Sequence, residues 1–180
     1  MNRYNVLIDI VNELQPKHVV EIGTWNGERA AQFMGVSNCY YTGFDLFEEA
    51  TPETDKEEYN VKKNFEIVEV GQMLETKGFS KFSLIRGNTN ETLKAHPILP
   101  FDFAFIDGGH SIATIKNDFD WVWENIEKGG TIILDDYYTP KQEGLGCNFL
   151  IEDYDLEILE PTDRTAICGV SLARVNVPAA

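Results

Sequence analysis

Residues 18–33 read HVVEIGTWNGERAAQF, in which an apolar run ends in an acid and two glycines before apolar residues recur at helical intervals. This change of period predicts a buried strand, a tight turn and the start of a helix. The spacing Glu21-x-Gly23-x-x-x-Gly27 predicts that the backbone approaches a ligand closely at the carboxyl end of the strand, where doubly wound sheets bind their ligands. A side chain at either glycine is expected to intrude on that ligand.

The same turn favours a ligand other than a dinucleotide. Dinucleotide folds use G-x-G-x-x-G, so that a pyrophosphate can lie at the N-terminus of the helix. Here Trp25 stands at the position of the middle glycine, and Glu21 brings a negative charge into the turn. A pyrophosphate would be repelled by that charge, whereas an amino or sulfonium group would be attracted. A glycine-bearing turn of some other α/β protein is the alternative.

Composition predicts one domain, residues 1–175, with a C-terminal tail at 176–180, because 180 residues with 43% hydrophobic content suffice for one core. The net charge of −15 makes nucleic acid and anionic membranes poor partners, so a small molecule is the expected ligand. Three cysteines without a C-x-x-C pair indicate neither a disulfide framework nor a zinc site. No stretch resembles a signal peptide or a membrane span. A cytoplasmic protein is expected, and homo-oligomer formation is left open.

A second strand is predicted over residues 39–47 and carries Asp45 near its end. One carboxylate there can accept hydrogen bonds from both hydroxyls of a ribose. Asp45 follows the glycine turn by about 20 residues, the distance at which a ribose partner is expected. An exposed acid at a strand end of an acid-rich chain is the alternative.

Other segments complete this half of the chain. Apolar spacing predicts a covering helix over residues 4–14, a helix over about 65–78 and a third strand over 82–86. The polar stretch 48–64 has no apolar period and is predicted to be a loop or a mobile flap. Asn88 follows the third strand, where its amide can reach the edge of an adenine, although turn propensity places an asparagine there equally well.

Three acids are predicted to converge at one edge of the sheet. Asp107 closes a fourth strand within residues 101–111, and Asp135 and Asp136 close a fifth strand, residues 131–138. Adjacent parallel strands bring these acids together, and a divalent cation would remove their repulsion. A set of carboxylates suits Mg²⁺, with Mn²⁺ or Ca²⁺ as further candidates, whereas zinc would require His or Cys. Acids that only cap loops at a charged rim are the alternative.

Two parts of the sequence resemble a known family. The turn that holds Glu21 is similar to motif I of class I S-adenosylmethionine (SAM) methyltransferases. The block DGGHSIATIKNDFDWVWENIEKGGTIILDDYY, residues 107–138, resembles the segment between strands four and five of metal-dependent small-molecule O-methyltransferases. The likeness is greatest to the macrocin-type sugar O-methyltransferases, and it extends over roughly residues 17–138.

The resemblance assigns roles to the residues at the strand ends. It implies that Asp107, Asp135 and Asp136 hold the metal, and that His110, three residues after the first acid, is the catalytic base. The histidine of an ordinary loop is the alternative for His110. The residues expected to bind SAM are Glu21, Gly23, Thr24, Gly27, Asp45, Asn88 and Asp107.

The resemblance also implies a Rossmann-like methyltransferase fold. This α/β fold has a seven-stranded, mostly parallel sheet in the order 3-2-1-4-5-7-6, with one antiparallel strand and helices on both faces. Residues 141–153 are expected to form a short helix, and two strands over 154–161 and 166–175 are expected to be joined by TDRT, residues 162–165. Residues 175–180 are expected to be a disordered tail.

The function expected from the sequence is methyl transfer from SAM to a hydroxyl of a sugar, polyol or catechol-like molecule, assisted by a divalent metal. The metal would act as Lewis acid and template, and His110 would take the proton. A SAM-binding protein without catalysis and a metal-independent methyltransferase remain as alternatives. A nicotinamide-dependent oxidoreductase is disfavoured by the spacing of the glycine turn.

Overall fold

The sheet of this protein has the predicted order, β3-β2-β1-β4-β5-β7-β6. The structure is a computed structural model that describes residues 2–60 and 62–179. Strands β1 to β5 run parallel, and β7 lies antiparallel between β5 and β6. The strands are β1 (His18–Ile22), β2 (Tyr40–Asp45), β3 (Phe82–Arg86), β4 (Phe103–Ile106), β5 (Thr131–Thr139), β6 (Glu157–Arg164) and β7 (Gly169–Asn176). The predicted fold class is confirmed.

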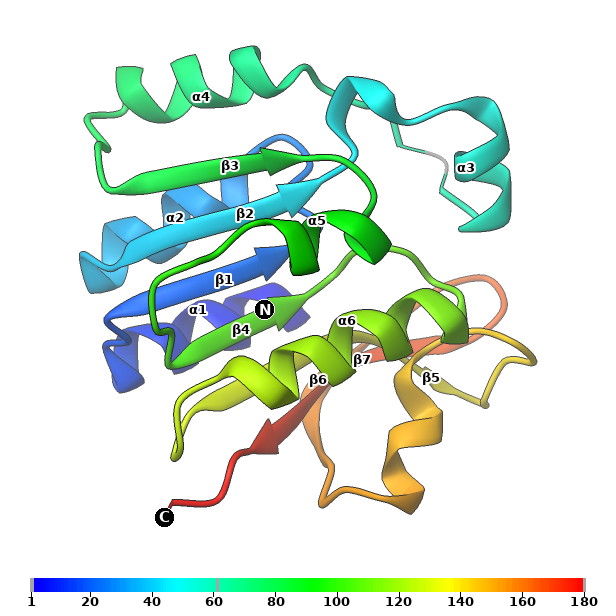
Figure 1. Ribbon diagram of the computed structural model, residues 1–180. Helices are drawn as coiled ribbons and strands as arrows, with labels where there is room; N and C mark the ends of the chain where they lie inside the picture. Colours follow the sequence, from blue (N-terminus) through cyan, green and yellow to red (C-terminus); the bar gives the residue numbers. More distant parts are fainter. Residues whose placement is uncertain (1, 61, 180) are drawn as a thin grey trace.

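Helices cover both faces of the sheet (Figure 1). Helices α5 (Thr89–Ala95) and α6 (Ile112–Asn125) pack on one face, and α1 (Arg3–Leu14), α2 (Glu28–Ser37) and α4 (Ile67–Thr76) pack on the other. None of the helices described in residues 2–60 and 62–179 is long and apolar enough to cross a membrane.

The apolar run of β1 follows from this two-sided cover. All five of its residues are buried. Because successive side chains of a strand point to opposite faces, Val20 joins the core beneath α5 and α6, whereas Val19 joins the core beneath α1 and α2. A parallel strand with both faces covered needs a nearly continuous apolar sequence rather than an alternating one.

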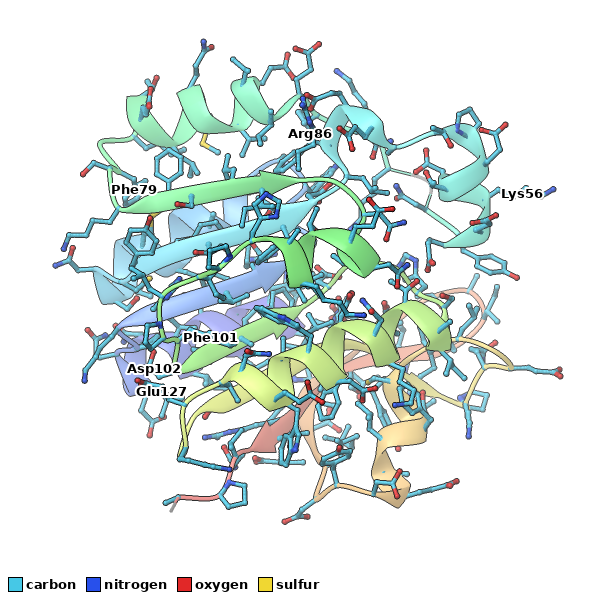
Figure 2. The ribbon with its side chains drawn as sticks, viewed as in Figure 1. Lys56, Phe79, Arg86, Phe101, Asp102 and Glu127 are labelled. Atoms are coloured by element: carbon cyan, nitrogen blue, oxygen red, sulfur yellow. The ribbon has the colours of Figure 1, made fainter. Side chains whose placement is uncertain are left out.

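The carboxyl ends of the parallel strands meet at one edge of the sheet, the edge at which helix α3 (Pro52–Glu57) also lies (Figure 1). In Figure 2, Arg86 marks this edge at the end of β3, and Asp102 marks the opposite edge at the start of β4. The carboxylate of Asp102 accepts hydrogen bonds from the backbone N–H groups of Lys17 and His18 at 3.0 and 3.1 Å. Asp102 therefore joins β4 to the start of β1 at the amino ends of the strands, on the side of the sheet opposite the carboxyl ends.

The stretch 48–64 is more ordered than the sequence predicts. It contains a 3₁₀ turn, Phe47–Glu49, and helix α3, while residue 61 lies outside the described residues. Helix α3 begins with a capping box between Thr51 and Thr54, and it buries none of its residues. The prediction of a loop was wrong here, because the helix is specified by its capping box and has no apolar stripe that a periodicity could reveal.

Three predictions for the last forty residues are corrected. The helix expected over 141–153 is only a 3₁₀ segment, Cys147–Glu152. Residues 162–164 of the expected turn belong to β6, so that the chain reverses at 165–168. The expected disordered tail is held at Val177, which is buried and donates its N–H to the carbonyl of Gly130 at 2.9 Å. Residue 180 lies outside the described residues.

Candidate active site at the carboxyl ends of the strands

A cavity of about 850 Å³ opens at the carboxyl ends of the parallel strands. Its wall comes from the turn after β1, the end of β2, the turns after β3 and β4, one side of α3 and the first residues of α1. Of the predicted site residues, those in the wall are Glu21, Gly23, Thr24, Asp45, Asn88, Asp107 and His110. The structure therefore brings together residues that are up to 89 positions apart in the sequence, from Glu21 to His110.

The two glycines of the first turn are required mainly by protein packing. Gly23 has a positive φ of 96°, and a Cβ there would overlap the carbonyl oxygen of Asp107 in the neighbouring turn. Gly27 is buried outside the cavity wall, and a Cβ there would lie 2.6 Å from Val70 Cγ1 and 2.9 Å from Met73 Cε of α4. The atoms that a side chain would meet at either glycine belong to the protein, so packing alone requires glycine here, and close approach of a ligand to this turn stays a prediction.

Gly23→Ala is expected to destabilise the protein by at least about 2 kcal/mol, because a strained φ and a clash with backbone add together. Gly78→Ala is the matched control, since Gly78 has a φ of 89° but no atom within 4 Å of its added Cβ. Urea denaturation of both variants measures the difference. If both variants lose the same free energy of unfolding, the contact between the turn after β1 and the turn after β4 does not require glycine at position 23.

Glu21 is a buried acid whose carboxylate accepts a hydrogen bond from the hydroxyl of Tyr41. Burial raises the pKa of Glu21 to about 8, against the lowering effect of that hydrogen bond. The side chain is therefore mostly protonated at neutral pH, and a cation placed beside it would favour its charged form. Thr24 is buried next to it, with its hydroxyl 3.1 Å from that of Tyr41.

Asp45 joins the end of β2 to the first turn. Its two carboxylate oxygens accept the backbone N–H groups of Trp25 and Phe47, both at 2.7 Å. Burial raises the pKa of Asp45, although these N–H groups oppose the shift. A carboxylate accepts about four hydrogen bonds, so these two do not use all of its acceptor positions, and Asp45 lines the cavity.

Asn88 caps a helix in addition to lining the cavity. Its side-chain oxygen accepts the N–H of Asn90 at 2.9 Å, and Asn88 is the N-cap of α5. Asn88 therefore has the local structural role in the turn that the sequence offered as an alternative. A contact of its amide with a ligand stays a prediction.

The acids after β4 and β5 are held in different ways. Asp107 is half-buried in the cavity wall, and burial, followed by the charges of Asp135 and Asp136, raises its pKa well above the ordinary value. Asp135 and Asp136 lie at a bulge, where the pairing of β5 with β7 shifts register and Asp136 has a φ of 64°. Neither of them is among the residues that line the cavity.

Asp135 is paired with Arg3, the first residue of α1. The guanidinium donates from Nε and Nη2 to the two carboxylate oxygens, each at 2.9 Å. The hydroxyl of Tyr4 donates to the same carboxylate at 2.7 Å. Burial alone would raise the pKa of Asp135, but Arg3 outweighs it and holds this pKa below its ordinary value.

This arrangement does not fit the metal site predicted at Asp107, Asp135 and Asp136. An organic cation already neutralises Asp135, and of the three predicted ligands only Asp107 lines the cavity. In residues 2–60 and 62–179, no group of three or more His, Cys, Asp or Glu side chains is arranged to hold a metal ion. The prediction considered only the acids at the strand ends and not the cation that α1 brings to them.

His110 lies in the cavity wall with a defined orientation. Its Nδ1 contacts the carbonyl oxygen of Glu58, and its Nε2 lies 3.6 Å from a carboxylate oxygen of Asp136. Because a carbonyl oxygen can only accept, Nδ1 must carry the proton of this hydrogen bond. In the neutral ring, Nε2 is therefore left with a lone pair, as a general base requires.

Two further residues of the site were missed from the sequence. Glu58, just after α3, accepts the N–H of Ser111 at 2.9 Å and the hydroxyl of Thr114 at 2.5 Å, so it caps the N-terminus of α6. Asp118 is buried in the cavity wall, and burial raises its pKa to about 7. Asp118 could have been found from the sequence, because it is an acid on the apolar face of α6, one residue before Phe119. The polar stretch around Glu58 has no such feature.

Solved structures with the same fold include methyltransferases for different acceptors. They include an rRNA methylase from Streptococcus thermophilus, with 16% identity and a TM-score of 0.69, covering 99% of this chain and 98% of that one. The O-methyltransferase TomG from Streptomyces achromogenes, in complex with SAM, has 15% identity and a TM-score of 0.69, with coverage of 97% and 78%. The N-methyltransferase NodS from Bradyrhizobium japonicum WM9, in complex with S-adenosylhomocysteine, has 16% identity and a TM-score of 0.65, with coverage of 97% and 86%. At such identities the likeness shows the fold alone.

Sequence comparison gives the family. No curated protein matches this chain. The family model described as a methyltransferase domain matches residues 20–137, a range that begins within β1, ends within β5 and includes every residue assigned above to the cofactor or the base. This match covers well over half of the 180 residues. The chain therefore belongs to the methyltransferase-domain family and has its Rossmann-like fold.

Proposed function

We propose that this protein transfers a methyl group from SAM to a hydroxyl of a small molecule such as a sugar, a polyol or a catechol. The observation that carries the proposal is the Nε2 lone pair of His110, in the wall of the same cavity that Glu21 and Asp45 line. A volume of about 850 Å³ is within the range of pockets that enclose ligands of this size. TomG and NodS, which share the fold, were solved with SAM and with its demethylated product.

Each end of the cofactor has a complementary group in the cavity. The ribose hydroxyls donate to Asp45, whose carboxylate has acceptor positions left. The amide of Asn88 lies at the end of β3, where it reaches the edge of the adenine. The ammonium group of the methionine part lies beside Glu21 and draws this acid into its charged form.

Methyl transfer then needs one base and a fixed line of attack. The acceptor oxygen attacks the methyl carbon, the carbon–sulfur bond breaks, and sulfur keeps the electron pair to give S-adenosylhomocysteine. His110 Nε2 takes the hydroxyl proton as the general base. The enclosed cavity contributes by holding oxygen, carbon and sulfur in line. The likeness to macrocin-type enzymes supports sugars as the first acceptors to test.

Two measurements test the proposal in sequence. Calorimetry with SAM and S-adenosylhomocysteine establishes whether the cavity takes the cofactor, and a parallel titration with NAD(P)H tests the oxidoreductase alternative. Transfer of labelled methyl to a panel of sugars, polyols and catechols then tests catalysis. Absence of SAM binding would refute the proposal. Binding without transfer to any hydroxylated acceptor would favour the non-catalytic alternative.

Asp45→Asn is expected to weaken SAM binding by about 1–3 kcal/mol, or about 5- to 150-fold, because a charged acceptor for the ribose hydroxyls is lost. The amide keeps the size of the side chain and one acceptor oxygen. Asp9→Asn, on the exposed side of α1, removes the same charge away from the cavity and should leave affinity unchanged. Calorimetry and the melting temperature are measured on the same preparations. Equal affinity in wild type and Asp45→Asn would remove Asp45 from the cofactor site.

A further inference from the structure

We propose that the guanidinium of Arg3 takes the place of a divalent metal ion at the carboxyl ends of β4 and β5, so that this chain positions its strand-end acids with a built-in organic cation. The binding part of this inference is independent of the proposed function. Its consequence for catalysis, that methyl transfer does not need a metal, rests on that function.

The first argument is that the carboxylate of Asp135 has no acceptor position left. Its Oδ1 accepts from Arg3 Nε at 2.9 Å and from the N–H of Asp136 at 2.8 Å. Its Oδ2 accepts from Arg3 Nη2 at 2.9 Å and from the hydroxyl of Tyr4 at 2.7 Å. A carboxylate offers about four lone-pair positions, and all four are used here. A metal ion could bind Asp135 only by displacing Arg3 or Tyr4.

The second argument is that the position of Arg3 is fixed from several sides. Its Nη1 donates to Asp163 of β6 at 2.7 Å, so one guanidinium joins β5 to β6. Helix α1 behind it is anchored by Leu7 and Val11, which are fully buried. Two parallel hydrogen bonds between a planar guanidinium and a carboxylate form a strong and directional pair. Arg3 is therefore part of the folded site rather than a surface side chain that rests against it.

The third argument is the charge around the pair. The guanidinium of Arg3 lies 4.5 Å from the centre of the Tyr4 ring, and that of Arg29, at the start of α2, lies 4.1 Å from the same ring. Both arginines line the cavity. Arg3 supplies a cation directly to Asp135 and Asp163, so this part of the acid-rich cavity has its counter-charge from the protein itself. Activation of the acceptor hydroxyl then depends on His110, and Arg3 acts as a positioning residue.

The test is a titration with Mn²⁺ alone, followed by calorimetry and by the relaxation of water protons. Wild-type protein should show no saturable one-to-one site tighter than about 1 mM, the weak end of carboxylate sites. Arg3→Met, which keeps the length of the side chain but frees Asp135, should bind Mn²⁺ at least about tenfold more tightly, because affinity at such sites rises with free ligand charge. Adding Asp135→Asn to Arg3→Met should remove this gain.

Arg174→Met is the matched control. It removes the same charge from β7, where Arg174 pairs with Glu157 at 3.9 Å and donates to Asn176 at 3.0 Å, and it should leave Mn²⁺ binding as in wild type. A one-to-one Mn²⁺ site in the wild-type protein that Asp135→Asn abolishes would overturn the inference, and this comparison does not require Arg3→Met to fold. Where methyl transfer is found, its full retention in EDTA supports the inference, and its loss with recovery in Mg²⁺ contradicts it. Failure to bind SAM would refute the proposed function but not the metal result.

Discussion

His110→Ala is expected to lower kcat by about 10²- to 10⁴-fold while the affinity for SAM stays nearly unchanged. The reason is that, under the proposed mechanism, Nε2 acts on the proton of the acceptor hydroxyl, which leaves only as the carbon–oxygen bond forms. SAM makes no use of this lone pair. Single-turnover methyl transfer and calorimetry, on one preparation of the variant, measure the two quantities.

The alternative role of His110 is to pack the loop between β4 and α6. That role predicts a lower melting temperature with kcat per folded molecule unchanged, so both values must be measured together. His96→Ala is a matched control, because His96 is an exposed residue at the end of α5. The loss in His110→Ala should shrink at high pH, where hydroxide can take the proton. A loss that stays constant up to high pH would contradict the assignment of His110 as base.

The second large effect is expected from Asp135→Asn, which should lower the free energy of unfolding by about 3–5 kcal/mol. Such losses follow when one partner of a buried ion pair is removed and the other charge stays in the protein. Arg3 would keep only Asp163 as its acidic partner. Urea denaturation measures the change. Asp120→Asn is the control, since it breaks an exposed pair with Lys116 on α6 and should cost no more than about 0.5 kcal/mol.

The pH dependence of this effect has a definite sign. Because Arg3 holds the pKa of Asp135 below its ordinary value, the ionised pair contributes fully above about pH 4 and is lost as the pH falls through the lower pKa of the folded protein. The difference in stability between wild type and Asp135→Asn should therefore narrow on acidification. A difference that is the same at pH 7 and at pH 3 would show that the ion pair does not carry the effect.

The parts of the fold that local sequence specifies were predicted well. A glycine turn after an apolar run located β1 and α2, and the acids at strand ends located the edge at which the cavity lies. Conversely, α3 was missed, because it is specified by a capping box and has no apolar stripe for a periodicity argument to find. The expected disordered tail failed for a related reason, since Val177 is held by the distant carbonyl of Gly130.

From the sequence, candidate site residues could be chosen one at a time, but their partners in the fold could not. His110 and Asp45 could be singled out because each stands at the end of a strand. Their partners could not, since Arg3 meets Asp135 across 132 residues and Glu58 meets Ser111 across 53. Such pairings depend on how α1 and α3 dock against the sheet, and a pattern within one segment contains no information about docking. For this reason the metal prediction left Arg3 out of account.

Under the proposed mechanism, the contact between Glu58 and His110 makes the reactivity of the base depend on the segment around α3 that lines the cavity. Glu58 holds the imidazole through its carbonyl and holds the start of α6 through its carboxylate. If α3 swings away to admit ligands, Nδ1 loses its acceptor and the ring is free to exchange tautomers, so that the lone pair no longer stays at Nε2. Under the proposed mechanism, His110 would thus be held in the tautomer of a base only while Glu58 keeps its contact with the ring.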